Sequence, residues 1–250
     1  MLVPKVKLFV LLSFMSFFVD SICAAPALFE KSVQSYDTAK YDESIDLLKQ
    51  IIEMGEATGK VYHNLASAYY RKGQLGESMS AILKARELMP RDPDVRANLR
   101  FIHEKTIDKV SFEESGGFWS LFFLDQYFSQ RELLYSACLF WVLAFLFLAV
   151  RLFVLKESSS LHISALCSLL LALFLFLNFY VSSFVKSQWA AVVVQEAKIR
   201  SGPDVSNTTV FKLHDGAPVS VQDEKRGWLL VAISDGKKGW VNSSEIRYYR

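Results

Sequence analysis

Two long apolar runs in the second half of the chain limit what it can fold into. Residues 133–155 contain one charged side chain, Arg151, and residues 163–185 contain none. A helix rises about 1.5 Å per residue, so roughly 20 residues cross the ~30 Å hydrocarbon core of a bilayer. The connector between the runs, Lys156–Ser160, is short enough to make them antiparallel. We therefore predict a transmembrane α-hairpin with helices at 133–155 and 163–185, rather than two buried helices of a globular core.

Composition supports a membrane protein and excludes some other classes. Apolar residues make up 52% of the chain and charged residues 22%. The net charge is +2, and no run of like charges is long enough for a nucleic-acid footprint, so we expect no nucleic-acid partner. Cys23, Cys138 and Cys167 all lie in or beside apolar stretches, which excludes a disulfide-stapled fold and a cysteine-based zinc site.

The N-terminus has the pattern of a secretory signal peptide, which we assign to residues 1–25. Two lysines precede the uncharged stretch Leu8–Val19, and small residues follow, with possible cleavage after Ala24, Ala25 or Ala27. Lipid attachment at Cys23 is an alternative with a poorer sequence match. A signal peptide and two crossings place both soluble parts outside the cytoplasm, and a retained signal anchor gives the same topology.

An aromatic segment at residues 116–130 precedes the first apolar run. It contains Trp119 and Tyr127, and these residue types favour the level of the lipid headgroups. We interpret the segment as interfacial, with a rigid linker as the alternative.

A 34-residue period runs through residues 28–110. Tyr41–Ser44 matches Leu75–Ser78 at this spacing, and Asn64-Leu65 recurs as Asn98-Leu99. The pattern resembles the tetratricopeptide repeat (TPR), a helix-turn-helix unit of 34 residues, and predicts an all-α array of about two and a half repeats. The best copy, residues 59–92, has these residues at the signature spacings: Tyr62, Leu65, Ala66, Tyr69, Gly73, Ser78, Ile82, Ala85 and Pro90.

The TPR resemblance implies a peptide-binding inner face on the first helix of each repeat. The corresponding candidate residues are Phe29, Val33, Tyr36, His63, Ser67, Tyr70 and Arg71, with Asn64 and Asn98 where some relatives hold peptide backbone. The full set of basic and amide residues that clamps a carboxylate in some relatives is not present. The alternative for each periodic residue is a place in the hydrophobic core.

The pattern of residues 188–250 predicts an all-β small barrel. Short alternating runs at 191–195, 209–213, 218–221, 228–233 and 239–241 are separated by turn residues. Ile199–Pro203, Gly227-Trp228 and Gly239-Trp240 resemble the motifs of the bacterial SH3-like domain. The resemblance implies that Ile199–Pro203 builds the loop after the first strand, and that Trp228 and Trp240 pack the barrel and border its groove.

The chain has no recognisable catalytic or metal-binding motif. The four histidines, His63, His103, His162 and His214, are scattered; we expect His162 to cap a membrane segment and the others to lie at the surface. Asp204-x-Ser206-x-Thr208 has the form of a metal-ion-dependent adhesion motif without its parallel-sheet context, so we interpret it as a polar loop. We predict a non-enzyme without cofactor or metal.

The order of the parts resembles one family as a whole. TPR repeats, two membrane helices and an SH3-like tail together are similar to the BatE component of the bacterial aerotolerance (Bat) family. The resemblance implies a non-catalytic scaffold in the bacterial inner membrane, with both soluble domains on the periplasmic side. Its implied partners are Bat membrane proteins with von Willebrand factor A domains, encoded beside a MoxR-type ATPase. Its implied role is in oxidative-stress tolerance or envelope integrity. The alternative is a tether or regulator that binds peptidoglycan through the SH3-like domain.

Overall fold

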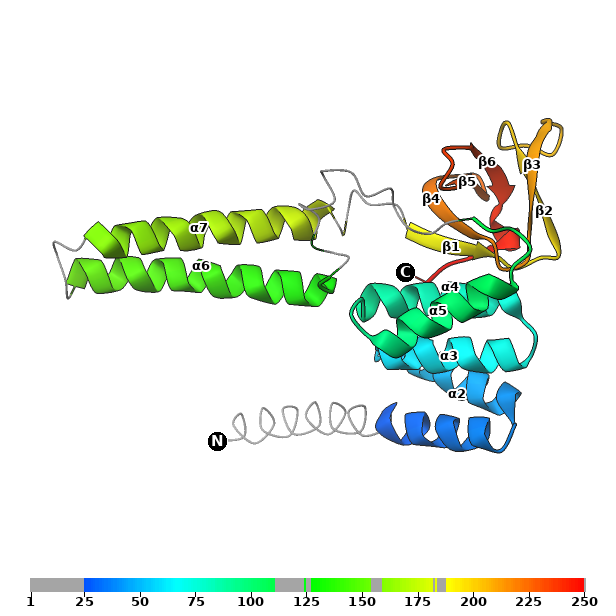
Figure 1. Cartoon of the computed structure of the whole chain (residues 1–250), viewed down its shortest axis with the longest axis horizontal. Coiled ribbons are helices and arrows are strands. Elements are labelled where there is room, and N and C mark those ends of the chain that lie inside the picture. Colours follow the sequence, from blue (N-terminus) through cyan, green and yellow to red (C-terminus); the bar gives the residue numbers. More distant parts are fainter. Residues whose placement is uncertain are drawn as a thin grey trace, which may run out of the picture.

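The computed structural model of the chain has a helical part, an apolar helical hairpin and a β-sheet (Figure 1). It describes residues 25–110, 124, 127–153, 159–181, 183 and 188–249. The predicted signal peptide, apart from residue 25, and most of the predicted interfacial segment lie outside the described residues.

The helical part is a stack of antiparallel helices whose positions repeat. A helix at residues 25–37 is followed by α2 (Tyr41–Glu53), α3 (Gly59–Arg71), α4 (Leu75–Leu88) and α5 (Pro93–Lys105). The starts of α2 and α4 are 75 − 41 = 34 residues apart, and those of α3 and α5 are 93 − 59 = 34 apart. The predicted period is therefore a period of helix starts.

Local signals explain where two of these helices begin. The Thr58 hydroxyl accepts the backbone N–H of Val61 at the start of α3, at 3.4 Å. Asp92 does the same for α5, accepting the N–H groups of Asp94 and Val95, and Pro93 takes the first helical position, where no N–H is needed. These caps satisfy donors that a helix start otherwise leaves unpaired.

One core joins α2 to α5, and small residues allow α3 and α4 to approach closely. Ala66 lies buried on α3, and the Ser78 hydroxyl on α4 donates to its carbonyl at 2.7 Å. Leu65 is completely buried. The other fully or almost fully buried large side chains of this core are Leu48, Ile51, Met79, Ile82, Val95 and Leu99.

The apolar hairpin consists of α6 (Gln130–Phe153) and α7 (Ser159–Tyr180). Both are long and apolar enough to cross a membrane, and most of their side chains face outward. Cys138 and Cys167 are exposed on this outward surface and unpaired. Both helices begin earlier than predicted, at residues 130 and 159 rather than 133 and 163. An apolar run marks the depth of the bilayer, whereas backbone hydrogen bonding continues into polar flanks, so His162 lies inside α7.

The C-terminal part is an antiparallel sheet of seven strands in the order β3-β2-β6-β5-β4-β1-β7. Its strands are β1 (Gln188–Val192), β2 (Glu196–Arg200), β3 (Thr209–His214), β4 (Pro218–Lys225), β5 (Trp228–Ala232), β6 (Lys238–Asn242) and β7 (Ile246–Arg247), with a 3₁₀ turn at Ser243–Glu245. The inward side chains form its own core: Ala190, Val192, Ala197, Ile199, Leu213, Ala217, Val219, Leu229, Val231, Val241 and Ile246.

The structure corrects the predicted strands in three places. The run predicted at 191–195 is displaced, because β1 spans Gln188–Val192. Ile199 and Arg200 belong to β2 rather than to a loop, because Ala197 and Ile199 alternate into the core; the loop begins at Ser201. β7 was not predicted, since two residues carry no detectable alternation. It pairs with β1 and forms the end of the sheet next to the helical part.

Candidate functional site

Three helices present one continuous side of the helical part, which we call the inner face. It consists of residues from the helix at 25–37, from α3 and from α5: Tyr36, His63, Asn64, Ser67, Tyr70, Arg71, Asn98 and Phe101. Contacts between helices assemble it. Arg71 Nε donates to the Tyr36 hydroxyl at 3.2 Å, and Asn98 Nδ2 lies 2.6 Å from His63 Nε2. The structure thus brings Tyr36 to Arg71 and His63 to Asn98, as expected for one face shared by neighbouring repeats.

Aromatic side chains give the inner face its apolar area. Tyr70 and Phe101 meet edge to face at 5.1 Å between ring centroids, and Phe101 stays 45% exposed. Tyr36 and Tyr70 are half-buried and pack partly against the core. Phe29 also packs there, so this predicted contact residue serves the core as well.

Phe101 is a residue of the inner face that the sequence analysis missed. It lies 101 − 67 = 34 residues after Ser67, so the repeat spacing could have identified it. Lys105 on the same helix places its ammonium 5.3 Å from the Phe101 ring centroid. On α3, the exposed Arg71 guanidinium donates to the Tyr36 hydroxyl, and this hydrogen bond raises the pKa of Arg71. Each of α3 and α5 therefore offers an aromatic ring with a cation beside it.

The sheet packs on α4 and leaves the inner face open. Asp215 Oδ1 accepts the Gly76 N–H at 2.9 Å, Ser80 donates to the Arg247 carbonyl at 3.0 Å, and Arg247 pairs with Glu77 at 3.1 Å. Among the described residues, no hydrogen bond, ion pair or ring contact between the two parts involves an inner-face residue.

Tyrosine and tryptophan rings extend this interface. Tyr249, after the last strand, packs against Tyr62 with ring centroids 5.0 Å apart, and burial raises the pKa of its hydroxyl. Trp189 of β1 lies 5.7 Å from the Arg86 guanidinium of α4. The interface centres on α4, with added contacts from Tyr62 of α3 and from Asp108 after α5, and none of these contacts involves Trp228 or Trp240.

The two predicted groove tryptophans lie together on the outer side of the sheet. Trp228 pairs with Asn242 across β5 and β6, and Leu230 pairs with Trp240. Directly opposed residues point to the same side, and their neighbours Leu229 and Val241 fill the core on the other side. Both tryptophans are half-buried. We call the outward surface of these residues the Trp face.

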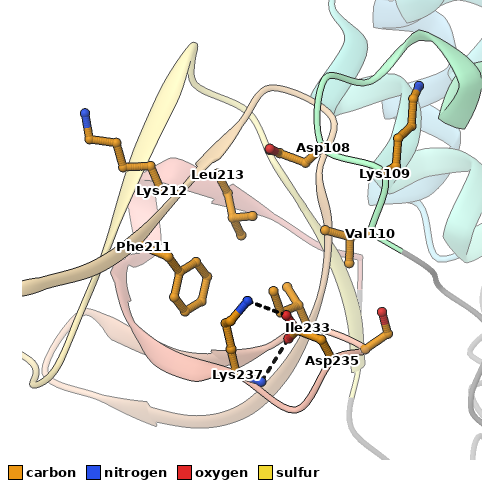
Figure 2. A pocket seen from close by; sticks show the side chains of 10 residues that line it. Asp108, Lys109, Val110, Phe211, Lys212, Leu213, Ile233, Asp235 and Lys237 are labelled. Carbon is orange, nitrogen blue, oxygen red and sulfur yellow. Dashed lines mark hydrogen bonds and ion pairs between the residues drawn. The ribbon is translucent and has the colours of Figure 1, made fainter.

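A pocket of about 350 Å³ opens at one end of the sheet (Figure 2). Phe211 and Leu213 of β3, Ile233 and Val110 supply its apolar lining, and the segment after α5 forms one wall. Asp108 in that wall holds His214, with 3.2 Å between Oδ1 and Nδ1.

The three lysines of this pocket already have partners. Lys212 pairs with Glu196 at 2.9 Å and Lys237 with Asp235 at 2.6 Å, the latter contact lowering the pKa of Asp235. Lys109 donates to carbonyl groups at the end of α5. The pocket therefore suits an apolar side chain better than an anion.

The predicted placement of the histidines needs correction. His63 and His214 are half-buried and hydrogen-bonded rather than free at the surface, and burial lowers the pKa of half-buried His103. No cluster of His, Cys, Asp or Glu that could hold a metal ion occurs in the described part of the chain. Asp204 accepts the N–H and hydroxyl of Ser206 at 2.8 and 2.7 Å, a local turn of the polar loop.

Comparison with known families identifies the C-terminal part. Residues 195–247 match the family described as bacterial SH3 domain. This match covers β2 to β7, and β1 adds a strand before it. The sheet with its Trp face is therefore a bacterial SH3 domain. No curated protein matches the chain.

Proposed function

We propose that this protein is a non-catalytic, membrane-anchored scaffold whose inner face binds a segment of a partner protein. The observation that carries the proposal is the open inner face, with half-buried Tyr70 and exposed Phe101 beside Arg71 and Lys105, on a helical part whose other side is occupied by the SH3 domain. Aromatic and arginine side chains dominate the energetics of protein interfaces. The helices then act as TPR-type repeats, and the hairpin of α6 and α7 acts as the anchor.

The partner class follows from the resemblance of the whole chain to BatE. We propose membrane proteins with von Willebrand factor A domains, in a Bat-type complex that supports the envelope under stress. With a signal peptide and two crossings, the inner face and the SH3 domain lie outside the cytoplasm, where such partners and the cell wall are both accessible.

A second candidate function rests on the Trp face. Bacterial SH3 domains often bind peptidoglycan or proteins, and two half-buried tryptophans on one side of a sheet suit stacking against sugar rings or peptide groups. In this alternative the chain tethers the membrane to the wall, and the inner face has no essential ligand.

Two double variants of the full chain separate the candidates. Tyr36→Ala with Tyr70→Ala removes aromatic anchors from the inner face, and Trp228→Ala with Trp240→Ala removes them from the Trp face. The scaffold predicts that the first variant loses co-purifying membrane proteins while its binding to cell-wall sacculi is unchanged. Loss of sacculus binding in the second variant, with membrane partners retained by both, would favour the tether. Circular dichroism checks that both variants fold.

A further inference from the structure

One end of the helical part lies beside the end of the apolar hairpin where α6 begins and α7 ends (Figure 1). Arg91, in the turn between α4 and α5, forms an ion pair with Glu132 in the first turn of α6. Its guanidinium also lies 5.1 Å from the ring centroid of Phe128. These contacts join the α4–α5 turn to the start of α6.

The start of α6 is itself held firmly. Ser129 and Glu132 form a capping box, in which the Ser129 N–H donates to the Glu132 carboxylate at 2.8 Å and the Glu132 N–H donates to the Ser129 hydroxyl at 3.3 Å. Asn178, near the end of α7, accepts the Leu124 N–H at 3.0 Å. Arg91 therefore contacts a start of α6 that is itself held by local hydrogen bonds and by α7.

Aromatic side chains mark the level of this junction in a bilayer. Tyr127 and Phe128 precede α6 and Tyr180 ends α7, and these three are exposed. Tyrosine and tryptophan gather at the headgroup level on both sides of a membrane. Since Arg91 contacts Phe128, the α4–α5 turn lies at the same level.

The turn between α2 and α3 belongs to the same end of the helical part. A Cβ atom at Gly59 would approach Met89 Cγ to 2.4 Å, so the start of α3 abuts the α4–α5 turn. Met54, at the end of α2, is an apolar side chain that is 42% exposed. We call residues 54–60 and 89–92 the membrane-facing end.

We propose that the membrane-facing end rests on the bilayer surface, with Arg91 contacting phosphates of lipid headgroups and Met54 entering the interface. This inference rests on the membrane anchoring in the proposed function. Within the described residues, Glu132 is the sole hydrogen-bond acceptor of Arg91, so further guanidinium donors can reach phosphates. The charges of this end are balanced, with Lys60 and Arg91 against Glu56 and Asp92, so the proposal requires zwitterionic lipids and not an anionic surface.

The helical part then stands upright on the membrane. α3 has 13 residues and spans about 20 Å, so its far end, near Gln74, lies that much farther from the headgroups. The inner face runs along α3, from the bilayer outward. The partner segment that fits this geometry is the extracytoplasmic stretch directly following a membrane helix of another protein.

Depth-resolved fluorescence quenching tests the arrangement. The full chain is reconstituted in phosphatidylcholine nanodiscs with single cysteines, labelled with a fluorophore at Met54→Cys or, as the matched control, at Gln74→Cys. Nitroxide lipids labelled at the headgroup should quench the first label about threefold more than the second, given the ~20 Å separation. Adding Arg91→Gln to the Met54→Cys protein should reduce this quenching.

Equal quenching at the two ends would overturn the inference. A label at native Cys138, on the outward surface of α6, reports separately on the anchor. If Cys138 is quenched by acyl-chain nitroxides while the two ends are equal, the hairpin is inserted and only the docking of the helical part is wrong. Absence of quenching at Cys138 would instead contradict the membrane anchoring itself.

Discussion

Ala39 shows how the repeat constrains a single residue. It has φ +59°, a left-handed conformation unfavourable for side chains with a Cβ atom, and it follows the helix at 25–37. One period later, 39 + 34 = 73, Gly73 has φ +76° after α3. The two turns share a geometry, but only the second has the residue that adopts it without strain.

Ala39→Gly should therefore stabilise the protein. Relief of the left-handed strain outweighs the extra freedom of glycine in the unfolded chain by about 0.5–1 kcal/mol. The reciprocal Gly73→Ala should destabilise by a similar amount, because nothing lies within 4 Å of its added Cβ and only backbone strain acts. Chemical denaturation of the full chain in detergent measures both, and shifts of the same sign would contradict this account.

Asp215 couples the SH3 domain to α4 through one carboxylate. Gln74, the residue before α4, makes no side-chain hydrogen bond to the helix start, and Asp215 from the turn after β3 accepts the Gly76 N–H instead. Burial raises the pKa of Asp215 above its usual 3.8. The charged form is thus less favourable when folded than when unfolded.

The raised pKa gives a signed prediction of pH dependence. For this group, stability is complete below the unfolded pKa and decreases as the pH rises through the folded pKa. Asp215→Asn keeps an acceptor and removes the charge, so its stability relative to wild type should increase between about pH 4 and pH 7. Asp215→Ala should destabilise at every pH, by about 1 kcal/mol, through loss of the cap. Parallel wild-type and Asn profiles in urea denaturation would refute the role of the carboxylate.

Among the elements, helices were predictable where local signals agree with the period, and short strands were less so. Asp92 and Pro93 are signals for the start of α5, and the 34-residue spacing predicts the starts of α2 and α4. β7 was missed because two residues give too little alternation and because its partner β1 lies more than 50 residues earlier. β2 was missed because Ile199-Arg200 was assigned to the following loop by resemblance, although Ala197 and Ile199 alternate into the core.

Gly76, in the first turn of α4, lies where the SH3 domain approaches most closely. A Cβ atom there would approach the Val192 carbonyl oxygen to 2.0 Å and the Asp215 carboxylate to 2.5 Å. Both neighbours belong to the SH3 domain, and the first is backbone. The glycine is therefore required by the contact between two elements rather than by the helix itself.

Gly76→Ala has an expected effect opposite to helix propensity. In an isolated helix the change stabilises by up to about 1 kcal/mol. Here it should destabilise by about 1–3 kcal/mol, because the two parts must separate to admit the methyl group. Hydrogen exchange at the start of α4 should accelerate. Gln50→Ala, at an exposed position on α2, is the control and should change stability little. A stabilised Gly76→Ala protein would show that the SH3 domain does not dock on the start of α4.

At the scale of the whole molecule, the docking of the SH3 domain on α4 could not be predicted from the sequence. Its hydrogen bonds join residues 139 and 167 positions apart, with the apolar hairpin between them in the chain. Composition and periodicity report each part separately and carry no signal for such a contact. The residues of the inner face, in contrast, could be proposed from the sequence, because they recur with the 34-residue period. Phe101 was missed, because the preceding copy has Ser67 at the corresponding position.

Docking joins the helical part and the SH3 domain into one unit that carries both proposed binding surfaces, the inner face and the Trp face. The SH3 domain covers α4 beside the last helix, in the manner of the capping elements that end helical repeat arrays. A partner held at the inner face and a ligand at the Trp face are then at a fixed separation, which is a useful property for a scaffold at a membrane.

Site-specific photo-crosslinking in native membranes tests the central claim, that the inner face binds a partner protein, most directly. A benzoylphenylalanine at Ser67, in the middle of this face, should crosslink to one or a few membrane proteins outside the cytoplasm. The same group at Gln50, exposed on α2, should not. Disappearance of the Ser67 crosslinks in the Tyr36→Ala, Tyr70→Ala background would agree with the account; identical crosslink patterns at Ser67 and Gln50 would contradict it.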